Sequence, residues 1–294
     1  DELVFVPGGP FLMGSREGDE GAYDDEYPQH TVQVADFCIG KYPVTNGQYA
    51  GFIQAGGYEE RGFWTEAGWA WRTGAREPDL SIVEDEELRK NYADWLARRP
   101  SEKRDRPFWW DDPAWNLSNH PVVGVSWYEA LAYTRWLAET AGRPYRLPTE
   151  AEWEKAASWD KETERQGDKG KKRKYPWGDE FDENKCNTSE TDIGRTSPVG
   201  CFPAGASPYG AVDMVGNVYE WCSSVGYREA KYPYRPDDGR EELERETWRA
   251  VRGGSWYGER RYARCAYRDF YHPGDFDSLF GFRVVLPGSA PSEC

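Results

Sequence analysis

Alternating apolar and polar residues open the chain. Val4 and Val6 precede a Gly-Gly-Pro sequence, and Phe11 and Met13 follow it. Alternation with a period of two is typical of a strand with one buried face, and glycine and proline favour a turn. These residues therefore predict a β-hairpin. The run at positions 30–39 alternates again and predicts a second pair of strands.

Three capping boxes predict where helices begin. They are formed by Thr45 with Gln48, Ser126 with Glu129, and Thr149 with Glu152. In such a box a hydroxyl caps a backbone amide, and the side chain three residues later returns the bond. Apolar residues at helical spacing follow, as at Trp127, Ala130, Tyr133 and Leu137.

The second half of the chain is less regular. After residue 160 it becomes rich in glycine, proline, asparagine and aspartate. Short strand-like pieces lie at Val199–Phe202, Trp248–Val251 and Gly281–Val285. Helices that come early and irregular strands that come late predict an α+β fold.

Residues 57–118 stand apart from these patterns because they combine many charges with seven tryptophans. These are Trp64, Trp69, Trp71, Trp95, Trp109, Trp110 and Trp115. A stretch of about sixty residues is marginal for a core of its own. We therefore interpret this Trp-rich segment as an insertion that packs on the rest of one domain.

Composition limits the classes of function. The 294 residues include 15 Trp, 19 Tyr and 31 Gly, which suits a loop-rich fold with large rings in its core. A net charge of −15 argues against nucleic acid and anionic membranes as partners. No apolar run of membrane-spanning length occurs. The six cysteines have no metal-like spacing, so free thiols and up to three disulfides both stay open. The chain opens with Asp1 rather than Met, and localisation is left open.

A series of motifs gives the chain a family resemblance. In order, it contains FVPGGPFLMGS, HTVQVADFCIGKYPVTNGQYAGF, HPVVGVSWYEALAYTRWLAE, YRLPTEAEWEKAA, YPWGDEF, VDMVGNVYEW, RGGSW and GFRVV. This sequence resembles the formylglycine-generating enzyme (sulfatase-modifying factor) family over nearly the whole chain except the Trp-rich segment. The resemblance implies one domain over residues 1–294, with a strongly modified C-type-lectin-like fold and little regular secondary structure.

The catalytic cysteines of that family are missing. Its enzymes use two cysteines, five residues apart after the GGS motif, to hold copper, and soft thiolate ligands select Cu(I). The matching positions here are Gly258 and Ala263, so we expect no formylglycine-generating activity. Cys265 matches a structural cysteine of the family, whose partner position is Ala157.

A second enzymatic branch uses histidine-ligated non-heme iron, which requires a cluster of imidazoles. This chain has only His30, His120 and His272, and the first two lie in motifs that resemble structural ones. We therefore expect neither copper nor iron.

Two segments match the family's calcium sites, and hard oxygen donors suit Ca²⁺. The resemblance implies ligands from Asn187, Thr188, Asp192 and Gly194 in one site, and from Asp213, Gly216, Val218 and Glu220 in the other. Asn217 and its neighbours also fit a simple turn. The expected cofactor is structural Ca²⁺.

The segment at 256–280 resembles the diversified stretch of variable proteins from diversity-generating retroelements, where adenine-directed mutation rewrites asparagine codons. The positions that carry residues reachable in this way, with the adjoining Trp256, are the expected ligand-binding residues. They are Trp256, Tyr257, Gly258, Asp269, Phe270, Tyr271, His272, Gly274, Asp275, Phe276, Asp277, Ser278, Leu279 and Phe280. Rigid rings among small and acidic residues are typical of a recognition surface. The hypothesis requires several of Phe270, Tyr271, Phe276 and Phe280 to be exposed.

The sequence therefore predicts a variable protein that binds a protein or small-molecule ligand and is not an enzyme. Two alternatives stay open. One is a copper or non-heme-metal oxidase of the same superfamily, and the other is a catalytically silent sensor or accessory domain.

Overall fold

The structure is a computed structural model that describes residues 2–76, 79–81, 83–160, 171–226, 230–288, 292 and 294. Its α-helices are α1 (Asn46–Gln54), α2 (Glu66–Thr73), α3 (Glu86–Leu96), α4 (Trp127–Ala141) and α5 (Glu150–Ser158). Its strands are β1 (Leu3–Val6), β2 (Gly9–Met13), β3 (His30–Val34), β4 (Phe37–Gly40), β5 (Trp159–Asp160), β6 (Lys171–Lys172), β7 (Tyr219–Val225), β8 (Arg249–Arg252), β9 (Asp269–Tyr271), β10 (Phe280–Gly281) and β11 (Val285–Pro287). Short 3-10 helices include η1 (Asp24–Glu26), η2 (Arg61–Phe63), η3 (Ser101–Lys103), η5 (Glu183–Lys185), η6 (Ser189–Thr191) and η7 (Pro203–Gly205).

The strands form small sheets among which helices are distributed, as an α+β fold requires. One sheet has the order β1-β4-β11, a second has β10-β7-β8-β9, and β2-β3 and β5-β6 form two-stranded ribbons. Most ladders are antiparallel, whereas β10 runs parallel to β7. The predicted strand at Val199–Phe202 is wrong, because Val199 and Gly200 form a turn in which Gly200 has a φ of 75°.

The predicted hairpin at the start of the chain is also wrong in its pairing. β1 pairs with β4, with Val4 opposite Ile39, and β2 pairs with β3, with Phe11 opposite Val32. The Gly-Gly-Pro sequence thus carries the chain from one sheet to another instead of reversing it. Both predicted strand pairs exist as strands, and each contributes one strand to each sheet.

The three predicted helix starts are confirmed. Thr45, Ser126 and Thr149 are the N-cap residues of α1, α4 and α5, and each closes a capping box. Their helices surround the most deeply buried rings. Trp127 of α4, Trp153 of α5 and Trp221 of β7 have no exposed surface.

Buried ion pairs join the helices to the central strands. Arg268 binds the Glu150 carboxylate through two nitrogens, each at 2.7 Å. Arg252 of β8 pairs with Glu154 of α5, and its Nη1 also lies 3.2 Å from Glu150 Oε1. Because these groups have little or no exposed surface, each carboxylate depends on its guanidinium partner for solvation.

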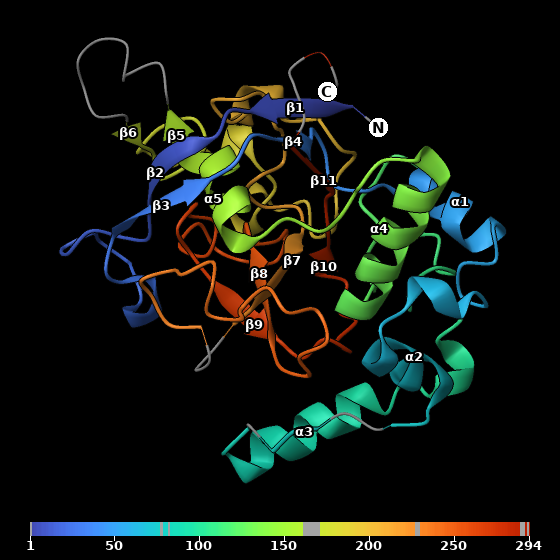
Figure 1. The fold of residues 1–294 in the computed structure, drawn as a ribbon. Coiled ribbons are helices and arrows are strands. Elements are labelled where there is room, and N and C mark those ends of the chain that lie inside the picture. The colour runs from blue at the N-terminus through green and yellow to red at the C-terminus, as the bar shows by residue number, and fades with distance from the viewer. Residues whose placement is uncertain are drawn as a thin grey trace.

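The Trp-rich segment forms α2 and α3 at the far side of α4 from β1 (Figure 1). Arg99 reaches the body of the protein and makes a fully buried ion pair with Glu129 of α4 at 2.6 Å. Trp71 packs against Tyr128, with ring centroids 5.7 Å apart. These contacts fix the segment to α4, and its interpretation as an insertion stays a prediction.

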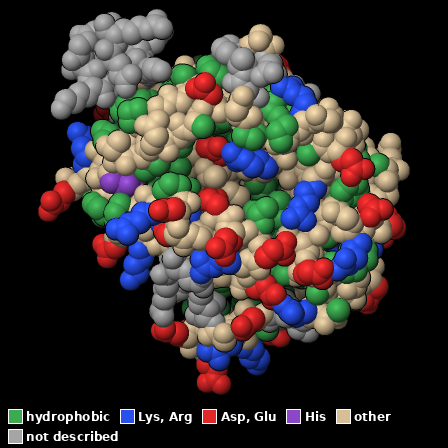
Figure 2. Space-filling view, in the orientation of Figure 1, with side chains coloured by type: hydrophobic (Ala, Val, Ile, Leu, Met, Phe, Trp, Pro, Cys, Tyr) green, Lys and Arg blue, Asp and Glu red, His purple; other side chains and the backbone are tan. Residues whose placement is uncertain are grey.

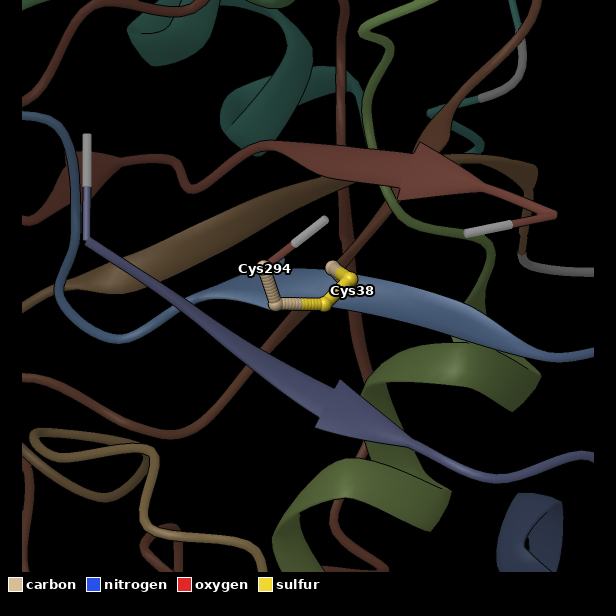
Figure 3. Close-up of a disulfide and its surroundings, with 2 residues drawn as sticks. All are labelled: Cys38 and Cys294. Carbon is tan, nitrogen blue, oxygen red and sulfur yellow. A yellow bond between two sulfur atoms is a disulfide. The ribbon is translucent and has the colours of Figure 1, made fainter. Parts of the chain in front are cut away.

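A disulfide links β4 to the last residue of the chain. Cys38 in β4 is bonded to Cys294, with Cα atoms 5.8 Å apart (Figure 3). Cys186, Cys222 and Cys265 are buried free thiols, and Cys201 is exposed. In the part of the chain that the structure describes, no helix is both long and apolar enough to cross a membrane.

Candidate functional site

The predicted ligand-binding segment is largely covered. Phe276 and Phe280 are each 1% exposed and Phe270 is 8% exposed, whereas Tyr271 is half-buried. Trp95 of α3 stacks on Phe276 with centroids 4.8 Å apart. Of the other predicted residues, His272, Gly274, Asp275 and Ser278 are buried, Trp256, Gly258, Asp269, Asp277 and Leu279 are partly exposed, and Tyr257 is exposed. An exposed face made of these rings is therefore wrong, because the Trp-rich segment lies over part of it.

The residues at the position of the family's copper site do not fit copper. Gly258 lies in a partly exposed turn and Ala263 is buried. The neighbouring Cys265 is buried in the same cluster as Ala157, and burial raises the pKa of its thiol to about 12. A thiol that stays protonated is a poor metal ligand.

The three histidines do not form an iron site either. His30 accepts the Tyr234 N–H at 2.7 Å through Nε2, so its Nδ1 is the nitrogen that donates to the Pro28 carbonyl. His120 contacts Thr196, and burial lowers the pKa of His272 to about 4. Within the described residues, no group of three or more His, Cys, Asp or Glu side chains could hold a metal ion.

The calcium ligands are engaged in other bonds. Arg283 binds the Glu220 carboxylate at 2.6 and 2.7 Å, and Trp153 Nε1 donates to it at 2.7 Å. The Asn187 amide donates to the Arg195 carbonyl. Among the other expected ligands, the Thr188 carbonyl accepts from Thr191, the Gly216 carbonyl accepts from Val218, and the Asp213 carboxylate accepts the Gly200 N–H. Asp192 lies at the end of η6, and Gly194 and Val218 complete the set. The Arg283 guanidinium thus binds the carboxylate that was expected to hold the second calcium ion.

A cavity of about 730 Å³ lies beside β9. It gathers four separate stretches of the chain, which are η1 with its flanks, residues 231–232, Trp248, and the residues that lead into β9. Its lining residues are Tyr23, Asp24, Asp25, Tyr27, Lys231, Tyr232, Trp248, Tyr267, Arg268, Asp269 and Phe270. Register with β8, which places Asp269 opposite Val251, positions the β9 part of the wall.

Asp269 is the half-buried carboxylate of this wall. Its Oδ2 accepts the Tyr267 and Tyr271 hydroxyls at 3.0 and 3.2 Å, and its Oδ1 accepts the Phe270 N–H at 2.9 Å. Burial raises the pKa of Asp269 although these bonds oppose the rise. Burial also raises the pKa of Asp25, against the nearby charge of Arg268.

Arg268 does not form an ion pair with these acids, because the Glu150 carboxylate binds the Nε–Nη2 edge of its guanidinium and Nη1 donates to the Asp25 backbone carbonyl. Its plane lies 3.9 Å from the centroid of the Tyr232 ring and 4.9 Å from that of Phe270. Arg268 therefore supports the aromatic wall from behind. Among the described lining residues, the charges that remain are the carboxylates of Asp24, Asp25 and Asp269 and the ammonium of Lys231.

Tyr232 supplies an unused polar group. Its side chain is 9% exposed, and its hydroxyl is buried with no hydrogen-bond partner among the described residues. A buried hydroxyl left unpaired costs about 1–3 kcal/mol.

On the wider surface, acidic and basic side chains are interspersed, with apolar patches between them (Figure 2). Among its described lining residues, the cavity has more acids than cations, together with six aromatic rings. The sequence interpretation included Asp269 and Phe270 but missed the other lining residues. The stretch Tyr-Asp-Asp-Glu-Tyr at 23–27 has the same mixture of rings and acids that singled out 256–280, and this signal was available.

Comparison with known proteins gives a consistent family. A family model described as the Sulfatase-modifying factor enzyme 1-like domain matches residues 1–287. Hercynine oxygenase of Mycolicibacterium thermoresistibile is 37% identical over 284 residues, which cover 94% of this chain and 56% of the relative. Formylglycine-generating enzyme of Thermomonospora curvata is 33% identical, with 96% and 92% covered. Serine/threonine-protein kinase pkn1 of Chlamydia caviae is 33% identical, with 97% and 38% covered.

Solved structures agree on the fold. PvdO from Pseudomonas aeruginosa has a TM-score of 0.65 at 26% identity, and 97% of this chain and 94% of that chain are covered. Treponema denticola variable protein 1 has a TM-score of 0.62 at 18% identity with the same coverage, which shows the fold alone. The narrower resemblance to variable proteins of retroelements is therefore not confirmed.

These relatives correct three expectations. The predicted role as a binding protein without catalysis is wrong, and so is the prediction that the chain is not an enzyme, because the relatives matched over most of the chain are named as enzymes. The expectation of calcium without copper or iron is wrong as well, since an oxygenase and a formylglycine-generating enzyme stand among these relatives. The prediction was wrong because the absence of the cysteine pair bears on only one of the family's chemistries.

Proposed function

Since the chain belongs to the family of the Sulfatase-modifying factor enzyme 1-like domain, we propose that it provides the substrate pocket of an oxidative enzyme and binds a small cationic substrate in the cavity beside β9. The observation that carries the proposal is the lining, in which the described residues combine three carboxylates and six aromatic rings with one cation, Lys231, outside the Arg268–Glu150 ion pair. The chain spans 56% of the length of the hercynine oxygenase that it matches, so the activity of a whole enzyme is part of the proposal.

The lining suits a substituted ammonium group. Aromatic faces attract cations within about 6 Å of the ring centroid, and the attraction grows when water is excluded. Tyr267 and Phe270 offer such faces, and Asp269 lies between them in the chain. Lys231 at the rim is placed for a carboxylate on the same substrate. Hercynine carries a quaternary ammonium, a carboxylate and an imidazole, and it is therefore the first substrate to test.

The role of these residues is to bind and orient the substrate and to exclude water. Tyr232 has a free hydroxyl for a polar atom of the substrate, and Asp269 can hold or release a proton beside it. The donors needed for copper or iron are not assembled among the described residues.

Isothermal titration with hercynine tests the proposal, with tetramethylammonium and histidine as comparison ligands. We expect hercynine and tetramethylammonium to bind and histidine to bind more weakly. Asp269→Asn should weaken cation binding at least about tenfold, which corresponds to ~1.4 kcal/mol. Asp111→Asn is the matched control, because that carboxylate is 79% exposed on the Trp-rich segment. Absence of binding by any cation at millimolar concentration would contradict the proposal.

A further inference from the structure

Helix α3 of the Trp-rich segment is attached to the rest of the protein by few side chains. Leu96 is its only buried residue, and Tyr92 and Trp95 are half-buried. Leu88, one turn before Tyr92 on the same face of the helix, is 62% exposed, so this face is covered only toward its C-terminal end. Figure 1 shows α3 at the edge of the molecule, below α2. A helix held by so few buried contacts depends strongly on each of them.

Both half-buried rings of α3 are bound to one carboxylate. The Tyr92 hydroxyl donates to Asp275 Oδ2 at 2.6 Å, and Trp95 Nε1 donates to Asp275 Oδ1 at 3.0 Å. Asp275 itself is 3% exposed. Two donors from one helix on the two oxygens of one buried carboxylate fix the helix in position and in rotation about its axis.

The same tyrosine touches the wall of the cavity. The Tyr92 ring lies 6.0 Å from the ring of Trp248, and Trp248 lines the cavity beside β9. A second contact joins the same two regions, because Arg76 pairs with Glu246, two residues before Trp248. The Trp-rich segment therefore supports the outer side of one cavity wall, although none of its described residues lines the cavity.

We infer that Tyr92 is a specificity-determining residue, which fixes the Trp248 wall of the cavity and so limits the width of the substrate that fits. This inference rests on the proposed function only in taking the cavity as the substrate pocket. Tyr92 acts through Trp248 and does not touch the substrate. Its hydroxyl secures α3 on Asp275, and its ring holds Trp248 in place.

The test uses three variants of the full chain. Tyr92→Ala removes the ring and the hydroxyl, and Tyr92→Phe removes only the hydroxyl. Leu88→Ala is the control, one turn away on the same face of α3, at a side chain that is 62% exposed. Circular dichroism melting first establishes that all three are folded. Tetramethylammonium and the wider benzyltrimethylammonium serve as probes of cavity width, and their Kd values are measured for each variant.

We expect the unmodified chain and Leu88→Ala to prefer the smaller cation by the same ratio. In Tyr92→Ala the ratio should shift toward the wider cation by about tenfold, and Tyr92→Phe should fall between. A ratio in Tyr92→Ala equal to that of the unmodified chain would overturn the inference.

A second measurement needs no ligand. Hydrogen exchange of the amides at 244–250 should quicken in Tyr92→Ala and stay unchanged in Leu88→Ala. Unchanged exchange in Tyr92→Ala would overturn the inference whether or not cations bind. Quicker exchange in a chain that binds neither cation would overturn the proposed function, and with it the role of Tyr92 in specificity, while showing that Tyr92 supports the wall.

Discussion

Two groups of carboxylates, one buried behind the cavity and one lining it, behave differently. Behind the cavity, Glu150 and Glu154 are each held by guanidinium groups, and the charge of these partners lowers the pKa of both. In the cavity wall, Asp269 and Asp25 have no such ion pair among the described residues, and burial raises the pKa of both.

The contrast separates a structural carboxylate from one available to a ligand. Glu150 and Glu154 already form ion pairs within the protein, so a cationic substrate would not improve their charge compensation. Asp269 has hydrogen-bond donors and a raised pKa. A cationic ligand would supply the positive charge that no ion-pair partner among the described residues provides. Raised pKa values of this kind favour functional sites over structural ones. The same reasoning separates Arg268, which Glu150 neutralises, from Lys231 at the cavity rim.

Removing the charge of Glu150 should have the largest effect. Glu150→Gln leaves Arg252 and Arg268 without their shared carboxylate in a buried position, and such a change costs about 3–5 kcal/mol. Urea unfolding measures the loss. Glu66→Gln, at a carboxylate that is 81% exposed, is the control and should cost less than about 1 kcal/mol. Equal losses in the two variants would contradict the distinction.

Acid should remove the contribution of Glu154. Lys172 at 2.5 Å and the buried Arg252 lower the pKa of Glu154 to about 2, from an ordinary value of 4.5. A lowered pKa stabilises the fold at pH values above 4.5, and this stabilisation disappears as the pH falls from 4.5 to about 2. The shift corresponds to about 3 kcal/mol. Unfolding free energies measured across this window should fall less steeply in Glu154→Gln.

At Asp269 we expect a substitution to change cation binding rather than the stability of the fold. Asp269→Asn removes a buried charge that lacks an ion pair, so we expect unfolding free energy to stay level or rise. Cation affinity should fall at least about tenfold, or ~1.4 kcal/mol. In the unmodified chain, cation affinity should also weaken with falling pH sooner than an ordinary aspartate would predict, because the pKa of Asp269 is raised. A large loss of stability with unchanged binding would place Asp269 with the structural carboxylates.

The smallest effect is expected at Tyr232. Tyr232→Phe removes a buried hydroxyl that has no partner among the described residues, so stability should not decrease. Hercynine binding should weaken by about 0.5–1.5 kcal/mol, the usual net value of one hydrogen bond. Calorimetric titration of both proteins measures the difference. A loss of stability without any loss of affinity would show that the hydroxyl already has a partner in the folded protein.

Local features of the fold could be predicted from the sequence, and pairings between distant segments could not. Capping boxes at Thr45, Ser126 and Thr149 act within four residues, and all three helix starts were correct. The first hairpin was wrong because β1 finds its partner in β4, more than thirty residues away. Alternation reveals a strand but not the strand beside it.

The site shows the same limit more strongly. Aromatic residues at 270–280 suggested an exposed face, yet Phe276 is covered by Trp95 from the Trp-rich segment. The cavity gathers Asp25, Tyr232, Trp248 and Asp269 from four parts of the chain. No local pattern connects such residues, although the acid and ring mixture at 23–27 marked one part of the wall.

A crystal structure of the chain with hercynine tests the central claim most directly. The account predicts hercynine in the cavity beside β9, with its ammonium group against the Tyr267 and Phe270 rings and near the Asp269 carboxylate. An empty cavity, with hercynine absent or bound only at the exposed Tyr257, would contradict it.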